Sequence, residues 1–448
     1  MEGERVMRFR RRTSLSALAV ALATVLAGCG SGPAQSSNGT GAASHASKGP
    51  IDLVYWAGHA SGALHAAVVA EVAQFNKTHS GIHVTFVATG ASKHGLAAFE
   101  AGTAPNVGMV SSYIVPQLTQ AHALLPLNSY IKGKNGLTAA QIRQDYYPAV
   151  WADMKLGSST QYMMPLEKKS LLVIYYNESL LKKAGIKTPP TSWAEVGADA
   201  AKITALGKGY HGIAWTPSLR QLFTIISADG GKVFATNANR SAYAMAYPQG
   251  IAALSMLSGW VQSGSMILTT GYQYQLDFGT GDVGMLIDAS AGYTYDKGSV
   301  GGKFVMGGVP APVGSSGHSS QYINGASLVM FNVGTAAQKA ASWTFVKWMS
   351  SPSTNTYWNE HTNYLPLGPA GYRMMKGFYA KHPAQAASFS NPAYWWFKPR
   401  AHVSGYEASK TPLDAIELEA LQGKISVQSA LEQMDRAGTS YLAGKTRE

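Results

Sequence analysis

The residues of this chain best suited to chemistry are aromatic side chains grouped with a cation. Residues 391–400, NPAYWWFKPR, place the adjacent Trp395 and Trp396 close to Arg400 in a stretch that proline interrupts. Flat aromatic faces stack on the C–H faces of sugar rings, while charged and amide groups hold the hydroxyls. At least one of two adjacent tryptophans must be a packing residue. We expect the other to contact a ligand.

Two other patterns imitate functional motifs. Gly207, Gly209 and Gly212 fit the GxGxxG spacing of dinucleotide-binding loops, but they follow a helical segment and precede a strand, which reverses the required order. We interpret them as the end of a helix. His79 and His83 flank a turn without neighbouring acids, and we interpret them as surface histidines rather than metal ligands.

Enzyme signatures are missing from the sequence. It has no HExxH, GxSxG or P-loop pattern, so it predicts neither a cofactor nor a metal and favours a binding protein over an enzyme. The single cysteine, Cys29, excludes an intrachain disulfide and a cysteine-based metal cluster.

The composition describes a large folded protein of low charge density. The chain has 448 residues, 46% of them hydrophobic, which is enough apolar material for two lobes. Lys and Arg number 36 against 24 Asp and Glu, giving a formal charge of +12, yet only 13% of residues are charged. The excess reflects scarce acids rather than a basic stripe, so we do not expect a nucleic-acid partner.

The N-terminus predicts export. Arginines precede an apolar run at residues 15–26 that is short for a membrane span and closes with Leu-Ala-Gly-Cys29. This ending resembles the lipobox of bacterial lipoproteins, in which the cysteine is acylated and becomes the first mature residue. Residues 1–28 are then a signal peptide, and residues 29–50, rich in Gly, Ser and Ala, are the lipidated cysteine and a flexible tether.

Beyond the tether, strand and helix patterns alternate. Residues 51–56 read as a strand, and residues 82–86 alternate as a second strand. Between them, one helical face carries Leu64, Val68, Val72 and Phe75. The same rhythm returns after residue 160 with the strands VIYYN, GIAW and DVGML. Such alternation predicts mainly parallel sheets that bind ligands beyond the carboxyl ends of their strands.

Eight blocks in order carry a family resemblance. They are Cys29 in its lipobox, Tyr-Trp at 55–56, AGTAPNVGMV at 101–110, PLEKKSLLVIYYNESLLKKAGI at 165–186, PPTSWAEV at 189–196, FGTGDVGMLIDAS at 278–290, INGASLVMF at 323–331 and NYLPL at 363–367. The chain resembles the extracellular solute-binding proteins of bacterial ABC importers, and most closely their carbohydrate and glycerol-3-phosphate binding branch.

The resemblance implies an α/β fold of two lobes, each a mainly parallel sheet flanked by helices, with one ligand held in the cleft and delivered to membrane permease subunits. The lobes would be discontinuous, with residues 51–168 and 325–363 in one and 169–324 and 364–448 in the other. Crossings are expected near residues 165–171, 322–325 and 364–366. We expect a monomer at the extracytoplasmic face of the cytoplasmic membrane or in the periplasm.

Cleft residues follow from the same resemblance, position by position. They are Trp56, His59, Tyr113, Glu167, Trp215, Asp288, Gly325, Tyr364 and Arg400.

The ligand class depends on two of these residues, Glu167 and Asp288. The resembling glycerol-phosphate binders carry short, hydroxylic side chains there. Because buried carboxylates repel phosphate but accept hydrogen bonds from sugar hydroxyls, a neutral carbohydrate is the first expectation and a phosphorylated polyol the second. An exported glycoside hydrolase using this carboxylate pair and a peptide-binding lipoprotein are the remaining alternatives.

Overall fold

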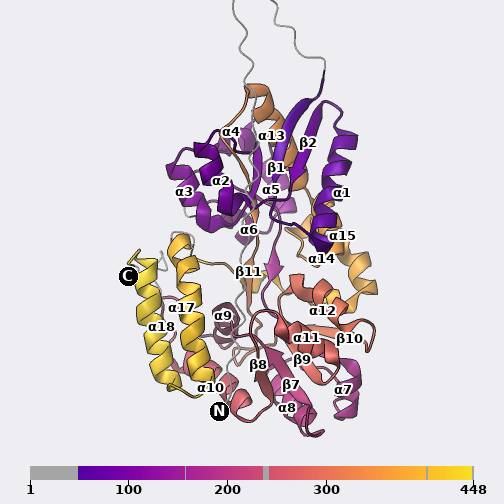
Figure 1. The fold of residues 1–448 in the computed structure, drawn as a ribbon, viewed down its shortest axis with the longest axis vertical. Coiled ribbons are helices and arrows are strands. Elements are labelled where there is room, and N and C mark those ends of the chain that lie inside the picture. Colours follow the sequence, from indigo (N-terminus) through magenta and orange to yellow (C-terminus); the bar gives the residue numbers. More distant parts are fainter. Residues whose placement is uncertain (1–48, 157, 236–241, 400–401, 446–448) are drawn as a thin grey trace, which may run out of the picture. The chain divides into compact units, whose positions relative to one another are not determined.

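The computed structural model describes residues 49–156, 158–235, 242–399 and 402–445. The predicted signal peptide, most of the tether and the predicted lipid attachment at Cys29 lie outside these residues, as does Arg400. Within the described part, two five-stranded sheets define two lobes, and a small three-stranded sheet, here called the linking sheet, connects them (Figure 1).

The first lobe is built on a sheet with the strand order β2-β1-β3-β12-β4. Its strands are β1 (Ile51–Trp56), β2 (Ile82–Val87), β3 (Val107–Val110), β4 (Met164–Pro165) and β12 (Ser327–Met330). The helical segments of its chain are α1 (Gly62–Thr78), α2 (Ala91–Glu100), η1 (Ser112–Ile114), α3 (Val115–Gln120), α4 (Asn128–Lys132), α5 (Ala139–Asp145), α6 (Pro148–Asp153), α13 (Ala336–Met349), α14 (Pro352–Thr362) and α15 (Pro369–Lys381).

The second lobe is built on a sheet with the order β10-β6-β9-β7-β8. Its strands are β6 (Val173–Asn177), β7 (His211–Trp215), β8 (Met266–Leu268), β9 (Val283–Asp288) and β10 (Met306–Pro310). Its helical segments are α7 (Glu178–Lys183), α8 (Trp193–Thr204), α9 (Leu219–Ala228), α10 (Pro248–Gln262), α11 (Gln273–Thr280), η2 (Ser290–Gly292), α12 (Tyr293–Val300), α16 (Pro383–Ala386), α17 (Val403–Leu421) and α18 (Val427–Leu442).

Both large sheets are mixed. The strands β2-β1-β3 run parallel, as do β9-β7-β8, and these are the βα repeats that the sequence predicts. The strands β12 and β4, and likewise β6 and β10, add antiparallel neighbours. The reversed strand is β12 in the first sheet and β6 in the second, since β12 is antiparallel to both β3 and β4 and β6 to both β9 and β10. Each of these two strands follows a crossing between the lobes, so the chain enters it from the opposite direction.

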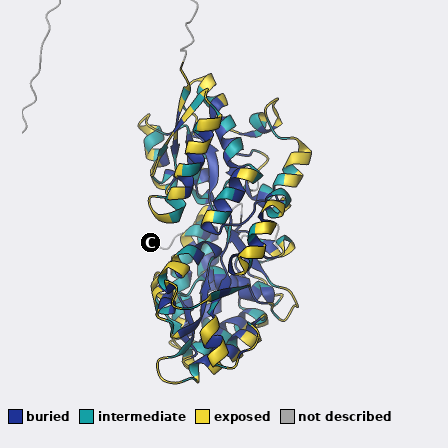
Figure 2. Cartoon of the chain, turned by 90° about the vertical axis from the view of Figure 1, so that its right-hand side faces the viewer, coloured by how far each residue is buried: buried dark blue, intermediate teal, exposed yellow. Residues whose placement is uncertain are grey.

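Buried strands lie inside shells of helices that are exposed on their outer sides (Figure 2). On α1 the predicted apolar face is confirmed, because Val68, Val72 and Phe75 are buried. The α8 helix begins with a capping box, in which the Ser192 side chain accepts from the Glu195 backbone N–H and the Glu195 carboxylate accepts from Ser192.

The linking sheet has the order β13-β11-β5, with β5 (Lys169–Ser170), β11 (Gln321–Asn324) and β13 (Trp395–Trp396), the last preceded by η3 (Pro392–Tyr394). Adjacent residues of β11 serve different cores: Tyr322 packs in the core of the second sheet and Ile323 in that of the first. The predicted crossings near residues 165–171 and 322–325 coincide with β5 and β11. At the third predicted crossing, Tyr364 and Leu365 pack in the first core.

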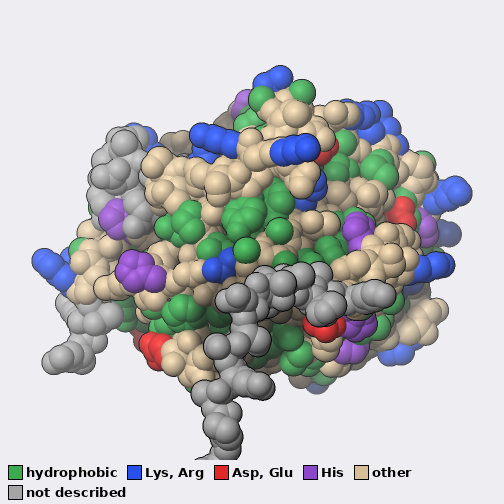
Figure 3. All heavy atoms as spheres, turned by 90° about the horizontal axis from the view of Figure 1, so that it is seen from above, with side chains coloured by type: hydrophobic (Ala, Val, Ile, Leu, Met, Phe, Trp, Pro, Cys, Tyr) green, Lys and Arg blue, Asp and Glu red, His purple; other side chains and the backbone are tan. Residues whose placement is uncertain are grey.

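Charge is dispersed over the face drawn in Figure 3. Lys and Arg side chains are scattered there among apolar and neutral ones and do not gather into one stripe.

Candidate functional site

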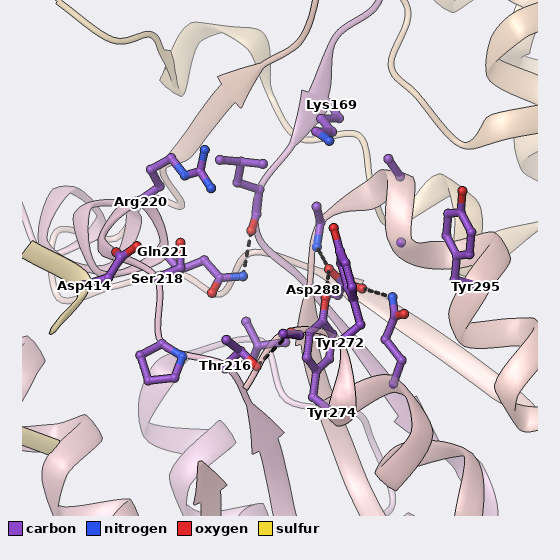
Figure 4. Close-up of a pocket in the computed structure, with 18 of the residues that line it drawn as sticks. Lys169, Thr216, Ser218, Arg220, Gln221, Tyr272, Tyr274, Asp288, Tyr295 and Asp414 are labelled. Atoms are coloured by element: carbon purple, nitrogen blue, oxygen red, sulfur yellow. Dashed lines mark hydrogen bonds between the residues drawn. The ribbon is translucent and has the colours of Figure 1, made fainter. Parts of the chain in front are cut away.

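A cavity of about 720 Å³ opens where the second sheet meets the linking sheet (Figure 4). Thr216, Pro217 and Ser218 line it directly after β7, and Asp288 lines it at the end of the parallel neighbour β9. The carboxyl ends of parallel strands are the usual ligand-binding edge of an α/β sheet, so the cavity lies where the topology predicts a site.

Four tyrosines give the cavity its aromatic surface. They are Tyr272, Tyr274, Tyr295 and Tyr364. Tyr272 is 75% exposed and Tyr295 47% exposed, whereas Tyr274 and Tyr364 are buried. Phenol rings combine an apolar face with a polar tip, so this wall suits a ligand with both C–H faces and hydroxyls.

The Asp288 carboxylate is held by donors from its own lobe. Oδ1 accepts from the Tyr274 hydroxyl at 2.9 Å and from the Ala289 backbone N–H at 2.6 Å, and Oδ2 accepts from Gln275 Nε2 at 3.0 Å. Burial raises the pKa of Asp288 and outweighs these hydrogen bonds, which lower it. The carboxylate therefore orients Tyr274 and Gln275, both of which line the cavity.

Asp296 on α12 lies close to Asp288. Its side chain is fully buried, and neither carboxyl oxygen has a hydrogen-bond partner within the described residues. Burial, together with the charge of Asp288, raises the pKa of Asp296 well above its usual value. The two carboxyl groups thus disfavour a double negative charge beside the cavity.

A second polar set occupies the first crossing. His59 Nε2 donates to Glu167 Oε2 at 3.1 Å, and both side chains are nearly buried. Burial alone would raise the pKa of Glu167, but the hydrogen bond and charge of His59 and the charge of Lys169 lower it below its ordinary value. Burial and the charge of Glu167 raise the pKa of Tyr364, which joins this set to the cavity wall.

Gly325 follows β11 at the second crossing, where two backbones come close. A Cβ at this position would overlap the carbonyl oxygen of Glu167. Glycine is therefore required here by the close approach of the chain, and Gly325 lies against the crossing rather than on the cavity wall.

Of the predicted ligand-binding residues, Asp288 and Tyr364 line the cavity. Trp215 is buried in the second core, where its indole N–H donates to Gln221 at 2.5 Å. Trp56 packs against a first-lobe cluster, and the Tyr113 carbonyl accepts from Ser404 on α17. Their direct contact with a ligand stays a prediction, as does that of His59, Glu167 and Gly325.

The two adjacent tryptophans pack on opposite sides of β13. Trp395 belongs to the first core and donates to Ser390 at 3.0 Å, whereas Trp396 packs against Tyr322 of the second core. Neither is part of the cavity lining. We expected one of the two to be a packing residue, and in the structure both are. Ligand contact stays a prediction for either. Arg400 lies outside the described residues.

Most residues that line the cavity were not predicted from the sequence. Thr216 and Ser218 could have been found from the strand GIAW alone, because the residues after a parallel strand lie at the binding edge. Tyr272 and Tyr274 follow the short strand β8 in the segment GYQYQ, an aromatic cluster without a core pattern. Nothing in the sequence marks Arg220, whose position depends on where α9 begins.

The described residues show neither a metal-binding cluster nor a membrane-spanning helix. Among them, no three His, Cys, Asp or Glu side chains converge as metal ligands. Searching the same residues, we find no helix with the length and apolar character needed to cross a bilayer.

Comparison with known proteins identifies the family. Residues 59–356, well over half of the chain, match the family of bacterial extracellular solute-binding proteins. The chain belongs to this family. The predicted family and the predicted class of function, solute binding, are thereby confirmed.

Individual solute-binding proteins agree with this assignment. The chain is 25% identical over 367 residues to the sn-glycerol-3-phosphate-binding periplasmic protein UgpB of Yersinia pseudotuberculosis, covering 78% of this chain and 82% of the relative. Its fold is similar to that of the cyclic alpha-maltosyl-1,6-maltose binding protein of Arthrobacter globiformis, with a TM-score of 0.74 and 20% identity over 88% of this chain and all of the other.

A third similar structure is UgpB of Mycobacterium tuberculosis in complex with glycerophosphocholine, with a TM-score of 0.73 and 18% identity over 89% of this chain and 99% of the other. These structural similarities confirm the predicted two-lobed fold. The family and the proteins compared here are binding proteins, which agrees with the absence of enzyme motifs.

Proposed function

We propose that this solute-binding protein is the extracytoplasmic receptor of an ABC importer and captures a carbohydrate in the cavity at the end of β7 and β9. The observation that carries the proposal is the cavity itself: about 720 Å³ at a sheet edge, walled by four tyrosines and by hydrogen-bonding side chains. Pockets of roughly 300–1,000 Å³ hold small organic ligands. The similarity to a maltose-type binding protein supports the same ligand class.

A glycerol phosphate or glycerophosphodiester is the second candidate. UgpB relatives whose names include sn-glycerol-3-phosphate cover most of the chain, and a structurally similar UgpB holds glycerophosphocholine. The engagement of Asp288 by three donors of its own lobe also weakens the argument that this carboxylate repels phosphate.

We further propose that Cys29 anchors the protein to the extracytoplasmic face of the membrane and that residues 29–50 tether the lobes to it. The first lobe would comprise residues 51–168 with 325–363 and the second residues 169–324 with the C-terminal part of 364–448, the third boundary lying after α15 because Leu365 and Leu367 pack in the first core. The segment LAGC after an apolar run supports the anchor, and the linking sheet supports the first two crossings. The delivered solute would pass unchanged to permease subunits.

A thermal-shift screen of the full chain tests the ligand class. The compounds are monosaccharides, malto-oligosaccharides, glycerol-3-phosphate and glycerophosphocholine. A ligand at about 100 times its Kd stabilises the folded state by about 2.7 kcal/mol, so a cognate solute should raise the melting temperature clearly. If none of these compounds raises it, or if a compound is chemically converted, the proposal is wrong.

Cavity variants locate the binding site. Tyr272→Ala removes an exposed ring from the cavity wall, and Tyr247→Ala removes an exposed ring that does not line it. Because truncating a contacting aromatic costs more than about 1 kcal/mol, Tyr272→Ala should weaken Kd about tenfold, while Tyr247→Ala should leave it unchanged. Equal Kd values for both variants would place the ligand elsewhere.

A further inference from the structure

Two cations in the cavity wall form no salt bridge with any described residue. Arg220, on the first turn of α9, makes no hydrogen bond through its guanidinium and no ion pair within the described residues. Lys169 of β5 forms no salt bridge within the described residues: its Nζ lies 5.6 Å from the centroid of the Tyr364 ring, and the charges of Glu167 and Asp288 act on it from a greater distance than a salt bridge. Figure 4 shows both side chains extending into the same part of the cavity.

The neighbouring cations, in contrast, are paired. Lys168 lies 3.9 Å from a carboxylate oxygen of Asp153, and Lys398 lies 3.0 Å from Glu407, which also pairs with Lys410. These cations have salt-bridge partners around the linking sheet, whereas Arg220 and Lys169, which face the cavity, have none within the described residues and interact with Glu167, Asp288 and Asp414 only beyond salt-bridge distance. Burial lowers the pKa of Lys169, which shows that its charge is held at a cost in free energy.

The cavity carboxylates accept hydrogen bonds from other donors. Asp288 accepts from Tyr274, Gln275 and a backbone N–H, and Asp414 accepts from the Leu219 backbone N–H at 2.8 Å. Neither carboxylate forms an ion pair with Arg220 or Lys169 within the described part of the chain. Burial raises the pKa of both carboxyl groups, while the charge of Lys169 lowers that of Asp288 and the charge of Arg220 lowers that of Asp414.

We propose that Arg220 and Lys169 form an anion subsite, so that the solute is a sugar or polyol bearing one carboxylate or phosphate group. This inference rests on the proposed function of the cavity and specifies its ligand. A planar guanidinium binds either oxyanion through two parallel hydrogen bonds, and the ammonium adds a second charge-assisted bond. The tyrosine wall would hold the hydroxylated body, and the cations would hold the acidic end.

Isothermal titration of the full chain with matched ligand pairs tests the subsite. Glucuronate against glucose isolates a carboxylate, and glycerol-3-phosphate and glycerophosphocholine against glycerol isolate a phosphate. We expect an acidic member to bind at least about tenfold more tightly than its neutral partner, with affinity falling as ionic strength rises. The pair that shows this preference identifies the chemical source of the anion.

Variants separate the subsite from general effects. Arg220→Gln should weaken the acidic ligand about tenfold or more and leave the neutral partner unchanged, and Lys169→Gln should do the same to a smaller extent. Arg220→Lys, which keeps the charge, should retain part of the preference and controls for folding. Arg436→Gln, on the exposed face of α18, should change neither affinity.

The outcomes distinguish this inference from the proposed function. If the neutral partner binds as tightly as the acidic one, or Arg220→Gln leaves acidic binding unchanged, the anion subsite is wrong while the carbohydrate receptor stands. If no member of any pair binds, and the thermal-shift screen is also negative, both are wrong.

Discussion

At the first crossing, His59 and Glu167 lie 3.1 Å apart and satisfy each other, whereas across the cavity the guanidinium of Arg220 has no hydrogen bond within the described residues. The two buried carboxylates differ in the same way. The pKa of Glu167 is lowered because His59 and Lys169 outweigh burial, and that of Asp288 is raised because burial outweighs its hydrogen bonds.

The difference indicates separate tasks. The Glu167 carboxylate is paired within the protein and contributes to the stability of the crossing. The cations without a salt bridge in the described residues and the exposed tyrosine rings of the cavity are instead free to bind a ligand. The residues that line the cavity support this division. Among the first-lobe helices only α1 contributes a described lining residue, Leu64, whereas the residues after β7, on α9 and on α11 belong to the second lobe. The second lobe therefore presents a preformed binding wall.

The largest expected effect is on stability at the crossing. Glu167→Gln removes a buried charge from its partner and should lower the free energy of unfolding by about 3 kcal/mol at neutral pH. Because the pKa of Glu167 is lowered by folding, its contribution is present above the unfolded pKa and lost as pH falls through the folded pKa. Denaturant unfolding at several pH values measures both effects.

The exposed Glu100→Gln on α2 is the matched control and should change stability by less than about 0.5 kcal/mol. The difference between Glu167→Gln and wild type should shrink as pH falls from the ordinary glutamate pKa of about 4.3 through the lowered pKa of the folded state. A loss as small as that of Glu100→Gln would contradict a stabilising role for the pair.

At Asp296, close to Asp288, removing the carboxylate should have the opposite effect on the free energy of unfolding. Asp296→Asn should raise the free energy of unfolding at pH 7, by about 1.4 kcal/mol for each unit by which folding raises the pKa of Asp296. A raised carboxyl pKa means that the folded state binds the proton more tightly, so its stability falls as pH increases from the unfolded to the folded pKa. The variant should lose this decline in thermal unfolding measured between pH 4 and pH 7.

Asp277→Asn, whose carboxylate is exposed and accepts from Gln273, serves as the control and should leave the pH profile as in wild type. If Asp296→Asn destabilises the protein at pH 7, then Asp296 is a satisfied charge and the comparison with Glu167 fails.

Loss of the predicted lipid anchor should have the smallest effect on the stability and ligand affinity of the lobes. Cys29→Ser should release the protein from the membrane fraction and leave its melting temperature and ligand affinity unchanged, because the predicted lipid site precedes the described lobes. Cell fractionation followed by thermal unfolding checks both statements. A variant that stays in the membrane at native abundance would contradict the lipobox interpretation.

The strands and helices could be predicted from the sequence better than the residues that line the cavity. Periodicity located β1, α1 and β7, because buried faces impose a repeat on the chain. Asp288, expected in the cleft from the family resemblance, lines the cavity, and its contact with a ligand stays a prediction. The tryptophan pair shows the limit. Adjacent residues of β13 point to opposite sides, and each side is covered by a different core.

Arg220 and Tyr272 could not be predicted for a related reason. Each lies on the cavity wall because the packing of the second lobe places its helix or loop there, and no spacing rule connects α9 with the segment before α11. Local sequence encodes the strands, whereas the binding surface depends on contacts between elements far apart in the chain.

The central claim is that the second lobe presents the binding wall, and from it we expect the first lobe to close over a bound solute. Small-angle scattering with and without a solute identified by titration tests this expectation. Ligand contacts formed in only one state shift a hinge equilibrium toward that state, so saturation should reduce the radius of gyration. Tyr272→Ala should require more solute for the same change. An unchanged radius at saturation, with the free protein shown to be open, would contradict the account.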